Sequence, residues 1–353
     1  MNSKKTILVA PLNWGLGHAT RCIPIIQGLL DNDYKVLLAS DGEALDLLRK
    51  EFADLPFIEL PSYNIKYSNR SRFFKLKMIL NSFSILNAIT SEKRLVKQLV
   101  SEEKIDGIIS DNRLGVRHKK IPSVFVSHQI TVLSGSTTFL STLLHQAYIK
   151  KFNVCWVPDV SGKTNLSGKL SHFKYSELNL KYIGVLSRMK KVDLEKRYDC
   201  LILLSGPEPQ RTLLQERLLA EFKNIDKQIL FVLGKVEAAQ KITTLNSITI
   251  YNFMLSHELE IAINESETII ARSGYTTLMD MVILKKKLFL IPTPGQYEQE
   301  YLAKYMQKLG VAPFSNQEKF TFKDLNRLGD YSGFTAIYYS PDFRILFTFF
   351  EGK

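Results

Sequence analysis

The amino-acid sequence predicts an α/β protein built on parallel β-sheets. The chain has 353 residues, which is long enough for two domains with a core each. Short apolar runs typical of buried strands alternate with helical patterns. The clearest unit begins with the run Thr268–Ala271, which ends at Arg272-Ser273-Gly274. A helical pattern follows, and a second apolar run, Leu288–Ile291, leads into a polar loop. Ligands bind at the carboxyl ends of parallel strands, so both loops are candidate ligand-binding loops.

The N-terminal half repeats the same strand–loop–helix order. It opens with a predicted strand at Lys5–Pro11, a loop at Asn13–His18 and a helix at Ala19–Leu30. The segment Val160–Ser176 is rich in Ser, Gly and Lys, and we expect it to be a surface loop. Further strands of this half are expected at Tyr34–Ala39, Pro56–Leu60, Ile105–Ser110, Pro122–Val126 and Asn153–Val157.

The C-terminal half is expected to form a second parallel sheet, followed by an aromatic tail. We place the domain boundary near Arg188, which gives domains at 1–188 and 189–330 and a tail at 331–353. In the tail, Ser340-Pro341-Asp342 suits a helix start with Ser at the cap and Pro in the first turn. Strands are expected at Asp199–Leu204, Gln228–Leu233 and Ile248–Asn252, with a helix at Thr212–Phe222.

The formal net charge of +12 belongs entirely to the N-terminal half. Residues 1–190 contain 27 Lys and Arg against 15 Asp and Glu, whereas residues 191–353 contain 20 of each kind. Such asymmetry indicates an anionic partner, either a nucleic acid or a membrane surface. A nucleic-acid site is expected to interleave aromatic with basic side chains. Because the basic run Arg70–Lys77 contains only Phe73 and Phe74, we consider nucleic acid the less favoured partner.

One basic segment within this half, 62–91, has an amphipathic pattern and no acidic residue. A basic amphipathic helix suits the interface of an anionic membrane. A core helix with a solvated basic edge explains the same pattern equally well, because amphipathicity alone does not separate the two. The basic residues are Lys66, Arg70, Arg72, Lys75 and Lys77, and the apolar ones at helical spacing are Phe73, Leu76, Leu80 and Phe83.

Cysteine usage and hydropathy indicate the compartment. Cys22, Cys155 and Cys200 are odd in number and have no metal-ligand spacing, which favours a cytoplasmic protein with reduced thiols. No apolar stretch reaches the length of a membrane span, and the first run, Thr6–Leu12, is too short for a secretory signal. We expect a cytoplasmic protein, with a peripheral position on the inner face of the membrane if the basic segment docks there.

The two loops of the C-terminal half resemble the donor site of nucleotide-sugar glycosyltransferases with two Rossmann-like domains. The residues that match are Arg-Ser-Gly-x-x-Thr-x-x-Asp from Arg272 to Asp280 and Pro-x-x-x-Gln-x-x-Gln-Glu from Pro292 to Glu300. The pattern is most similar to that of the N-acetylglucosaminyltransferases that form peptidoglycan lipid II. The resemblance implies that Asp280 holds the ribose hydroxyls and that Gln299 and Glu300 contact the donor sugar. Glu300 departs from that family, which has an amide at this position, so the resemblance does not identify the donor sugar.

Other donor contacts are expected from both halves of the chain. Arg211, at a predicted helix start, suits the neutralisation of a diphosphate. The resemblance implies that backbone groups around Phe253 and Met254 read the uracil ring. The full set of expected donor-site residues is Gly17, Gly206, Arg211, Phe253, Met254, Arg272, Ser273, Gly274, Thr277, Asp280, Gln296, Gln299 and Glu300.

The stretch Gly15-Leu16-Gly17-His18 resembles the glycine-rich loop near the start of the first domain in the same enzymes. A dinucleotide fingerprint is absent, because Thr20 stands where its third glycine belongs. In several inverting members the histidine is the catalytic base, which implies that role for His18, with Asp111 as the carboxylate alternative. A capping or buried histidine without chemistry is the other interpretation.

Polar residues also follow two further strands of the N-terminal half. Asp111-Asn112-Arg113 and Ser127-His128-Gln129 should open on the same cleft if the sheet is parallel. We therefore expect acceptor contacts from Asn112, Arg113, His128 and Gln129, although a loop-bracing role explains each of them as well. His128 is also the nearest rival of His18 as the base.

Together these features predict a B-type glycosyltransferase fold, in which two Rossmann-like domains face each other across a cleft and a C-terminal helix returns to the first domain. We expect an inverting transfer of a hexose or N-acetylhexosamine from a UDP-sugar to an acceptor hydroxyl, with lipid-linked and cell-envelope glycans as candidate acceptors. No tightly bound cofactor or metal is expected, because helix N-termini and Arg211 would carry the leaving charge. The alternatives are a nucleotide-sugar 2-epimerase of the same fold and a non-catalytic basic module that binds membrane or nucleic acid.

Overall fold

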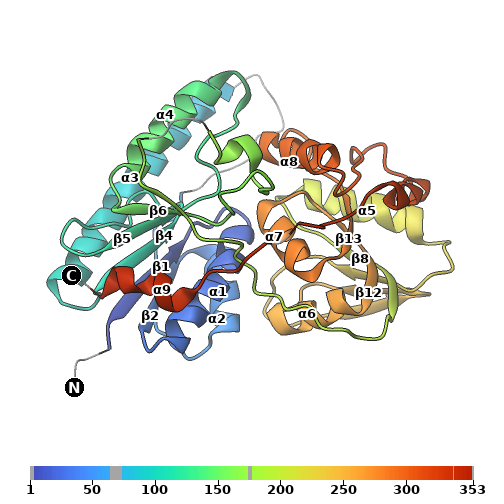
Figure 1. The fold of residues 1–353 in the computed structure, drawn as a ribbon, viewed down its shortest axis with the longest axis horizontal. Helices are drawn as coiled ribbons and strands as arrows, with labels where there is room; N and C mark the ends of the chain where they lie inside the picture. Colours follow the sequence, from blue (N-terminus) through green and yellow to red (C-terminus); the bar gives the residue numbers. More distant parts are fainter. Residues whose placement is uncertain (1–3, 64–73, 174–176, 337, 352–353) are drawn as a thin grey trace.

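The computed structural model describes residues 4–63, 74–173, 177–336 and 338–351, with the backbone alone for 74–83. The chain forms two lobes, each with a β-sheet covered by helices on both faces (Figure 1). Nearly all strand pairs in both sheets are parallel, the β10–β11 pair being antiparallel. The predicted α/β class with two Rossmann-like sheets is confirmed.

The N-terminal sheet has its topological switch point between β1 and β4. Within the described residues its order is β3-β2-β1-β4-β5-β6-β7. The chain leaves β1 toward β2 on one side and reaches β4 on the other, so the loops after β1 and β4 open at one crevice. The strands are β1 (Thr6–Pro11), β2 (Lys35–Ser40), β3 (Phe57–Glu59), β4 (Gly107–Asp111), β5 (Ser123–Val126), β6 (Val154–Val157) and β7 (Leu180–Tyr182). The helices are α1 (Gly17–Asp31), α2 (Gly42–Glu51), α3 (Phe74–Ser101) and α4 (Thr138–Ile149).

The C-terminal sheet has the order β10-β11-β9-β8-β12-β13, with its switch point between β8 and β12. Strand β10 was not predicted from the sequence, because its four residues are all exposed and carry no burial signal. The strands are β8 (Tyr198–Leu203), β9 (Ile229–Val232), β10 (Ile242–Leu245), β11 (Ile248–Tyr251), β12 (Ser266–Ala271) and β13 (Lys287–Leu290). The helices are α5 (Gln210–Phe222), α6 (Ser256–Asn264), α7 (Tyr275–Leu284) and α8 (Tyr297–Lys308).

The central strands are buried on both faces, which explains their continuous apolar runs. Ile7 to Ala10 in β1 and Ile269 to Ala271 in β12 are at most 2% exposed. The strands at the two switch points are therefore rigid, and they fix the positions of the loops that follow them.

Within the described residues 160–173, the expected surface loop is found only in part: residues 161–164 are exposed, whereas residues 165–168 and Leu170 are buried. Asp159 is fully buried, and its carboxylate accepts hydrogen bonds from the backbone N–H groups of Val160, Leu166 and Ser167. These bonds fold the segment inward and bury Leu166 and Leu170 completely. A buried carboxylate that organises a loop leaves no signature in composition, which is why the burial of residues 165–168 and Leu170 was not predicted.

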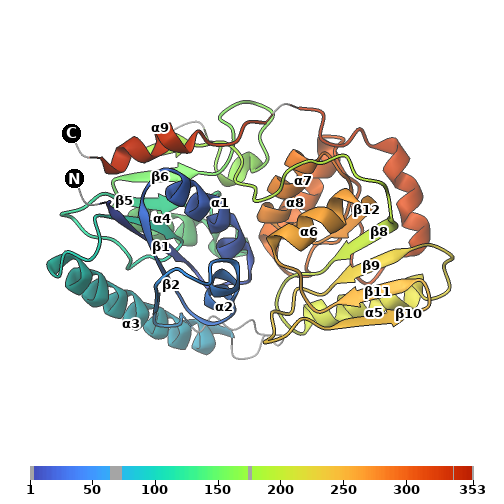
Figure 2. The ribbon, with the colours of Figure 1, turned by 90° about the horizontal axis from the view of Figure 1, so that it is seen from below.

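After the 3₁₀ helix η4 (Phe322–Asp330), the chain crosses back to the N-terminal lobe and forms α9 (Phe343–Phe347) and η5 (Thr348–Phe350) there (Figures 1 and 2). The rings of Phe347 and Phe350 pack at 6.3 and 6.1 Å from Trp156 of β6. The cap of α9 is Asp342, whose Oδ1 accepts from the N–H of Ile345 at 3.1 Å, and not the expected Ser340.

The basic segment 62–91 falls largely outside the described side chains. Residues 64–73 lie outside the described part of the chain, and the side chains of α3 are described only from Ser84 onward. Lys66, Arg70, Arg72, Lys75 and Lys77 are therefore not placed, and the membrane role of this segment stays a prediction.

Candidate functional site

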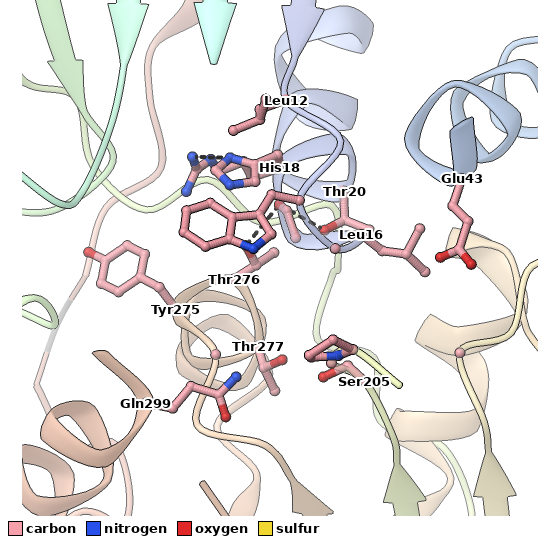
Figure 3. A pocket seen from close by; sticks show the side chains of 18 of the residues that line it. Leu12, Leu16, His18, Thr20, Glu43, Ser205, Tyr275, Thr276, Thr277 and Gln299 are labelled. Atoms are coloured by element: carbon pink, nitrogen blue, oxygen red, sulfur yellow. Dashed lines mark hydrogen bonds between the residues drawn. The ribbon is translucent and has the colours of Figure 1, made fainter. Parts of the chain in front are cut away.

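A cavity of about 700 Å³ lies between the two lobes. Its N-terminal wall includes the loop after β1, with Gly15–His18, and its C-terminal wall includes Gly274–Thr277 at the start of α7. Figure 3 shows His18 facing Thr276 and Tyr275 across this space. Both loops leave their sheets at switch points, which is where open α/β sheets bind ligands.

His18 and Asp111 form a hydrogen-bonded pair in the N-terminal wall. Asp111 ends β4 and is fully buried, whereas the side chain of His18, in the first turn of α1, is 14% exposed to the cavity. Nδ1 of His18 lies 2.8 Å from Oδ1 of Asp111. When Nδ1 donates its hydrogen to the carboxylate, Nε2 keeps the lone pair that a general base needs.

The electrostatics of the pair favour the protonation states of a base and its orienting carboxylate. Burial lowers the pKa of His18, and the guanidinium of Arg21 lowers it further, against the opposing effect of Asp111. Burial works against the ionised form of Asp111 as well, but the charges of Arg21 and His18 and their hydrogen bonds outweigh it and hold the pKa of Asp111 well below its usual range. At neutral pH a neutral imidazole therefore lies beside an ionised carboxylate.

Arg21 joins this pair to a second histidine. Its Nε and Nη2 donate to the two oxygens of Asp111, and its Nη1 lies 2.9 Å from Nδ1 of His128. On the other side of the ring, Nε2 of His128 lies 2.7 Å from Oε1 of Glu298, and the ring stacks on Tyr275 with centroids 4.0 Å apart. Glu298 and Tyr275 belong to α8 and α7, so this chain of contacts crosses the cleft.

Sequence reasoning missed Arg21, Tyr275 and Glu298. Arg21 lies three residues after His18, which places both on one face of α1 and was an available signal. Glu298 occupies an unspecified position of the Pro292–Glu300 motif, so its contact with His128 required the fold.

The start of α7 forms the C-terminal wall in the way expected for an anion site. Gly274 is the N-cap of the helix, and residues 274–277 line the cavity. The N–H groups of this first turn have no partner within the helix and are directed out of its N-terminus, toward the cavity. Oγ1 of Thr276 donates to the carbonyl oxygen of Gly17 at 3.0 Å, which ties the two loops together. A Cβ on Gly17 would lie 3.2 Å from that hydroxyl, so glycine allows the close approach.

Asp280 lines the cavity one turn further along α7. Its Oδ1 accepts from Oγ of Ser187 at 2.7 Å, and burial raises its pKa to about 6 although Arg188 opposes the shift. Ser187 and Arg188 lie in the connector between the two sheets. The carboxylate is thus buried, lies in the cavity lining and contacts the connector.

At the far end of the C-terminal wall the structure brings together three of the expected donor residues. Gly206, with φ of 98°, Phe253 and Met254 all line the cavity. The carbonyl oxygen of Phe253 already accepts from Nε2 of Gln240 at 3.0 Å, and its N–H donates to Oδ1 of Asn252. Recognition of a base there would therefore fall mainly to the backbone of Met254.

Arg211 lines the cavity but has protein partners for two of its nitrogens. Nε donates to Oε1 of Glu208 at 2.9 Å and Nη1 to the carbonyl oxygen of Gly234 at 2.6 Å. These bonds hold the loop before α5 against the loop after β9. Gln296 and Gln299 also line the cavity, and Oε1 of Gln299 accepts from the N–H of Thr293.

Four expected contacts are not brought to the cavity. Arg272 is fully buried and donates to the carbonyl oxygens of Ile291, Pro292 and Gln210. Buried Ser273 donates to the carbonyl oxygen of Gln299. The expected donor and acceptor contacts outside the cavity lining are Arg272, Ser273, Glu300 and Arg113.

The last two of these have structural partners of their own. Oε1 of Glu300 accepts from the N–H of Gly295 at 2.9 Å and so closes its own loop. Arg113 is fully buried between Asp41 and Glu92, with Nη1 2.9 Å from Oε1 of Glu92. Its neighbour Asn112 and the residues His128 and Gln129 do line the cavity.

Within the residues that the structure describes, no group of three or more His, Cys, Asp or Glu side chains is arranged to hold a metal ion. The helices of that part of the chain also include none that combines the length and the apolar character of a membrane span.

The comparisons with known proteins agree with this geometry. Residues 208–330 match the family model described as glycosyltransferase family 28 C-terminal domain. The UDP-N-acetylglucosamine–N-acetylmuramyl-(pentapeptide) pyrophosphoryl-undecaprenol N-acetylglucosamine transferase of Clostridium perfringens SM101 is 22% identical over 330 residues, which is 90% of this chain and 87% of that protein.

Solved structures show the same fold over almost the whole chain. MurG of Acinetobacter baumannii superposes with a TM-score of 0.53 at 18% identity and covers 93% of this chain and 90% of its own. CalG4, the calicheamicin glycosyltransferase, gives a TM-score of 0.61 at 11% identity, with 94% and 91% covered. Two facing parallel-sheet domains with a family 28 sequence define a nucleotide-sugar glycosyltransferase of the two-domain, B-type fold. Its residues 208–330 match glycosyltransferase family 28, and the whole chain is distantly similar to the N-acetylglucosamine transferase of Clostridium perfringens.

Proposed function

We propose that the protein is an inverting glycosyltransferase that moves a hexose or N-acetylhexosamine from a UDP-sugar to an acceptor hydroxyl. The observation that carries the proposal is the His18–Asp111 pair, which faces the N-terminus of α7 across one cavity. One wall offers a proton acceptor, and the other offers an anion site.

The proposed reaction is a single displacement. The acceptor oxygen attacks the anomeric carbon of the donor sugar while its proton passes to Nε2 of His18. The bond between the anomeric carbon and the diphosphate oxygen breaks, and the nucleotide diphosphate departs from the opposite face, which inverts the anomeric centre. Ionised Asp111 stabilises the imidazolium that forms.

The charge that develops on the diphosphate is stabilised by the start of α7. The free N–H groups of its first turn and the hydroxyl of Thr277 lie on that wall. Preorganised donors of this kind need no reorganisation during the reaction. The ribose hydroxyls are proposed to bind Asp280, and the sugar to lie against Gln299.

The N-terminal part of the cavity supports an acceptor with an apolar portion. Leu12, Tyr63, Ile85, Leu114 and Val132 line it next to the polar Asn112 and Gln129. An amphiphilic acceptor, such as a lipid-linked glycan, matches a wall of this composition.

A peripheral position on an anionic membrane fits the same lobe. Helix α4 exposes Phe139, Leu140, Leu143 and Leu144, each between 48% and 77%. Lys93 lies near Lys151, just beyond the end of α4, and near Arg117. Lys93 and Arg117 line a basic surface groove together with Lys97, Lys119 and Lys120. Exposed apolar side chains and a group of cations on one lobe are what an anionic lipid surface binds. We therefore place the enzyme on the cytoplasmic face of such a membrane, with α4 as a docking element in addition to the segment 62–91.

The base is tested with His18→Ala, which removes the proton acceptor and leaves the opposite wall intact. We expect turnover to fall by a factor on the order of 10²–10⁴ while UDP affinity is retained. Release of UDP from a UDP-sugar is measured beside UDP binding by calorimetry. Near-normal turnover would refute the role of His18. Lost UDP affinity in the folded variant would make His18 a diphosphate contact instead.

A further inference from the structure

The polar contacts that cross the cleft link a carboxylate of the C-terminal lobe, the proposed donor lobe, to the proposed base. They run from Glu298 through His128 and Arg21 to Asp111 and His18, and we call them the cross-lobe network. We propose that Glu298 is a positioning residue: it fixes the tautomer of His128, which anchors Arg21 and thereby keeps the His18–Asp111 pair in the arrangement for proton transfer. The inference rests on the proposed function of His18.

The tautomer of His128 follows from its two neighbours. Arg21 can only donate hydrogen bonds, so Nδ1 of His128, 2.9 Å from Nη1, must accept. The carboxylate of Glu298 can only accept, so Nε2, 2.7 Å from Oε1, must carry the hydrogen. A neutral His128 with its hydrogen on Nε2 satisfies both contacts. This arrangement also leaves His128 without a free lone pair, so it does not compete with His18 as the base.

The anchoring of Arg21 matters because its Nη2 lies within hydrogen-bond distance of two atoms, only one of which accepts in the arrangement that the base needs. It donates to Oδ1 of Asp111 and lies 2.7 Å from Nδ1 of His18. Nη2 is already near enough to donate to Nδ1, and a small rotation of Arg21 that directed one of its hydrogens there would require the ring hydrogen of His18 to sit on Nε2. A ring protonated there cannot take the proton of the acceptor hydroxyl. The bond to His128 holds the third nitrogen of Arg21 and opposes that rotation.

The donor-lobe end of the network is itself held firmly. Glu298 lies in the first turn of α8, where the helix N-terminus favours a carboxylate. Burial works against its ionised form, but His128, Arg21 and His18 outweigh that effect and lower its pKa. Tyr275, which stacks on His128, donates its hydroxyl hydrogen to the carbonyl oxygen of Pro158 at 2.9 Å. His128 is thus held by α7 and α8 of the C-terminal lobe. The network that positions His18 therefore forms only when the two lobes are in contact in this way.

Among the described residues, the charged groups and the histidine that act on the pKa of His18 belong to this network, and Tyr275 faces the same cavity. Arg21 comes from the same helix, Asp111 from β4, His128 from the loop after β5 and Glu298 from α8. Removing the Glu298 carboxylate therefore changes His18 both through its charge and through the position of Arg21.

The first test needs no acceptor substrate. Long-range ¹H–¹⁵N spectra of the histidine-labelled protein report which ring nitrogen of each histidine is protonated. We expect His128 to hold its hydrogen on Nε2 in the wild type and to populate the other tautomer in Glu298→Ala. Glu298→Gln should restore the wild-type tautomer, because the amide oxygen accepts the same bond. Glu300→Gln, the same chemical change two residues along, should leave the His128 signals unchanged. Wild-type signals for His128 and His18 in Glu298→Ala would overturn the proposal.

The second test is a double-mutant cycle on UDP release from a UDP-sugar. If Glu298 acts through His128, Glu298→Ala lowers kcat on the order of tenfold in the wild type and adds nothing in a His128→Ala background. Equal losses in both backgrounds, or a change confined to the KM of the donor, would make Glu298 a direct sugar contact and overturn the proposal. Full turnover in His18→Ala would refute the proposed function separately, whatever the cycle shows.

Discussion

Replacing Asp280 by asparagine should make the folded protein more stable and its donor complex weaker. Asp280 is 7% exposed, and burial raises its pKa to about 6 from an ordinary value of 3.8. At pH 7 the protein therefore holds a buried carboxylate in its ionised form. Asparagine keeps the shape and an oxygen for Ser187, and it removes the charge.

The expected gain in the free energy of unfolding of Asp280→Asn follows from the shift in the pKa of Asp280. About two units at 1.36 kcal/mol each give about 3 kcal/mol of destabilisation in the wild type. Because the folded pKa lies above the unfolded one, this cost is absent below about pH 4, grows as pH rises toward 6 and is constant above that. The stability gain of Asp280→Asn should follow the same profile, with its full value at pH 7. Since Arg188 loses a partly compensating charge, we treat about 3 kcal/mol as the upper value.

Donor binding should change in the opposite direction. An ionised acceptor of the ribose hydroxyls contributes on the order of 2 kcal/mol, so Asp280→Asn is expected to weaken donor binding about thirtyfold at pH 7. In the wild type, affinity should fall as pH drops through 6. A UDP-sugar is the appropriate probe, because the terminal phosphate of free UDP itself ionises near pH 6.

Urea unfolding at pH 4, 6 and 8 and calorimetry with UDP-glucose and UDP-N-acetylglucosamine measure the two effects. Asp226→Asn, which neutralises an exposed acid of the same lobe, is the control and should change neither. A variant that is less stable than the wild type at pH 8, or one that keeps full donor affinity, would refute the reasoning.

Three further changes test other parts of the structure. Arg113→Met leaves Glu92 and Asp41 buried without their cation and should cost about 3–5 kcal/mol in urea unfolding; a loss below about 1 kcal/mol would show that water reaches the cluster. Phe139→Asp with Leu143→Asp should abolish co-sedimentation with anionic vesicles. Ile242→Asp with Leu245→Asp, two apolar residues that are 56% and 51% exposed on the other lobe, should not abolish it; binding unaffected by the first pair would exclude α4. Gly28→Ala should destabilise the protein by about 1–3 kcal/mol, because the added Cβ would lie 2.6 Å from the ring of Phe343. Combining it with Phe343→Ala should relieve the strain; additive losses of stability for the two changes would contradict this contact.

The sequence was most informative where burial and loop chemistry coincide. The apolar runs located the central strands, and the polar residues that end them, from His18 to Gln299, mostly line one cavity. Arg272 and Arg113, which were expected to contact ligands, lie outside the cavity lining, and there is a general reason for this. A cation next to a strand end is as useful for bracing carbonyls or acids as for binding an anion, and only packing tells them apart.

Other features could not be predicted because they depend on contacts between distant segments. The hydrogen bond between His128 and Glu298 joins residues 170 positions apart, and no local sequence pattern predicts it. The same holds for Asp159, whose carboxylate turns a Ser- and Gly-rich segment into a partly buried one. The roles of the site residues and the domain boundary near Arg188 stay predictions.

The return of α9 to the N-terminal lobe has a consequence for the order of folding. Lys5, at the edge of β1, donates to the carbonyl oxygens of Phe350 and Glu351, so the first strand and the last helical turn belong to one cooperative unit. The C-terminal sheet, β8 to β13, is in effect an insertion into that unit. During synthesis the inserted lobe has all its strands before the surrounding one is complete. The sheet of the N-terminal lobe, β1 to β7, is made first, but this lobe lacks the packing of Phe347 and Phe350 on Trp156 until residues 343–350 leave the ribosome.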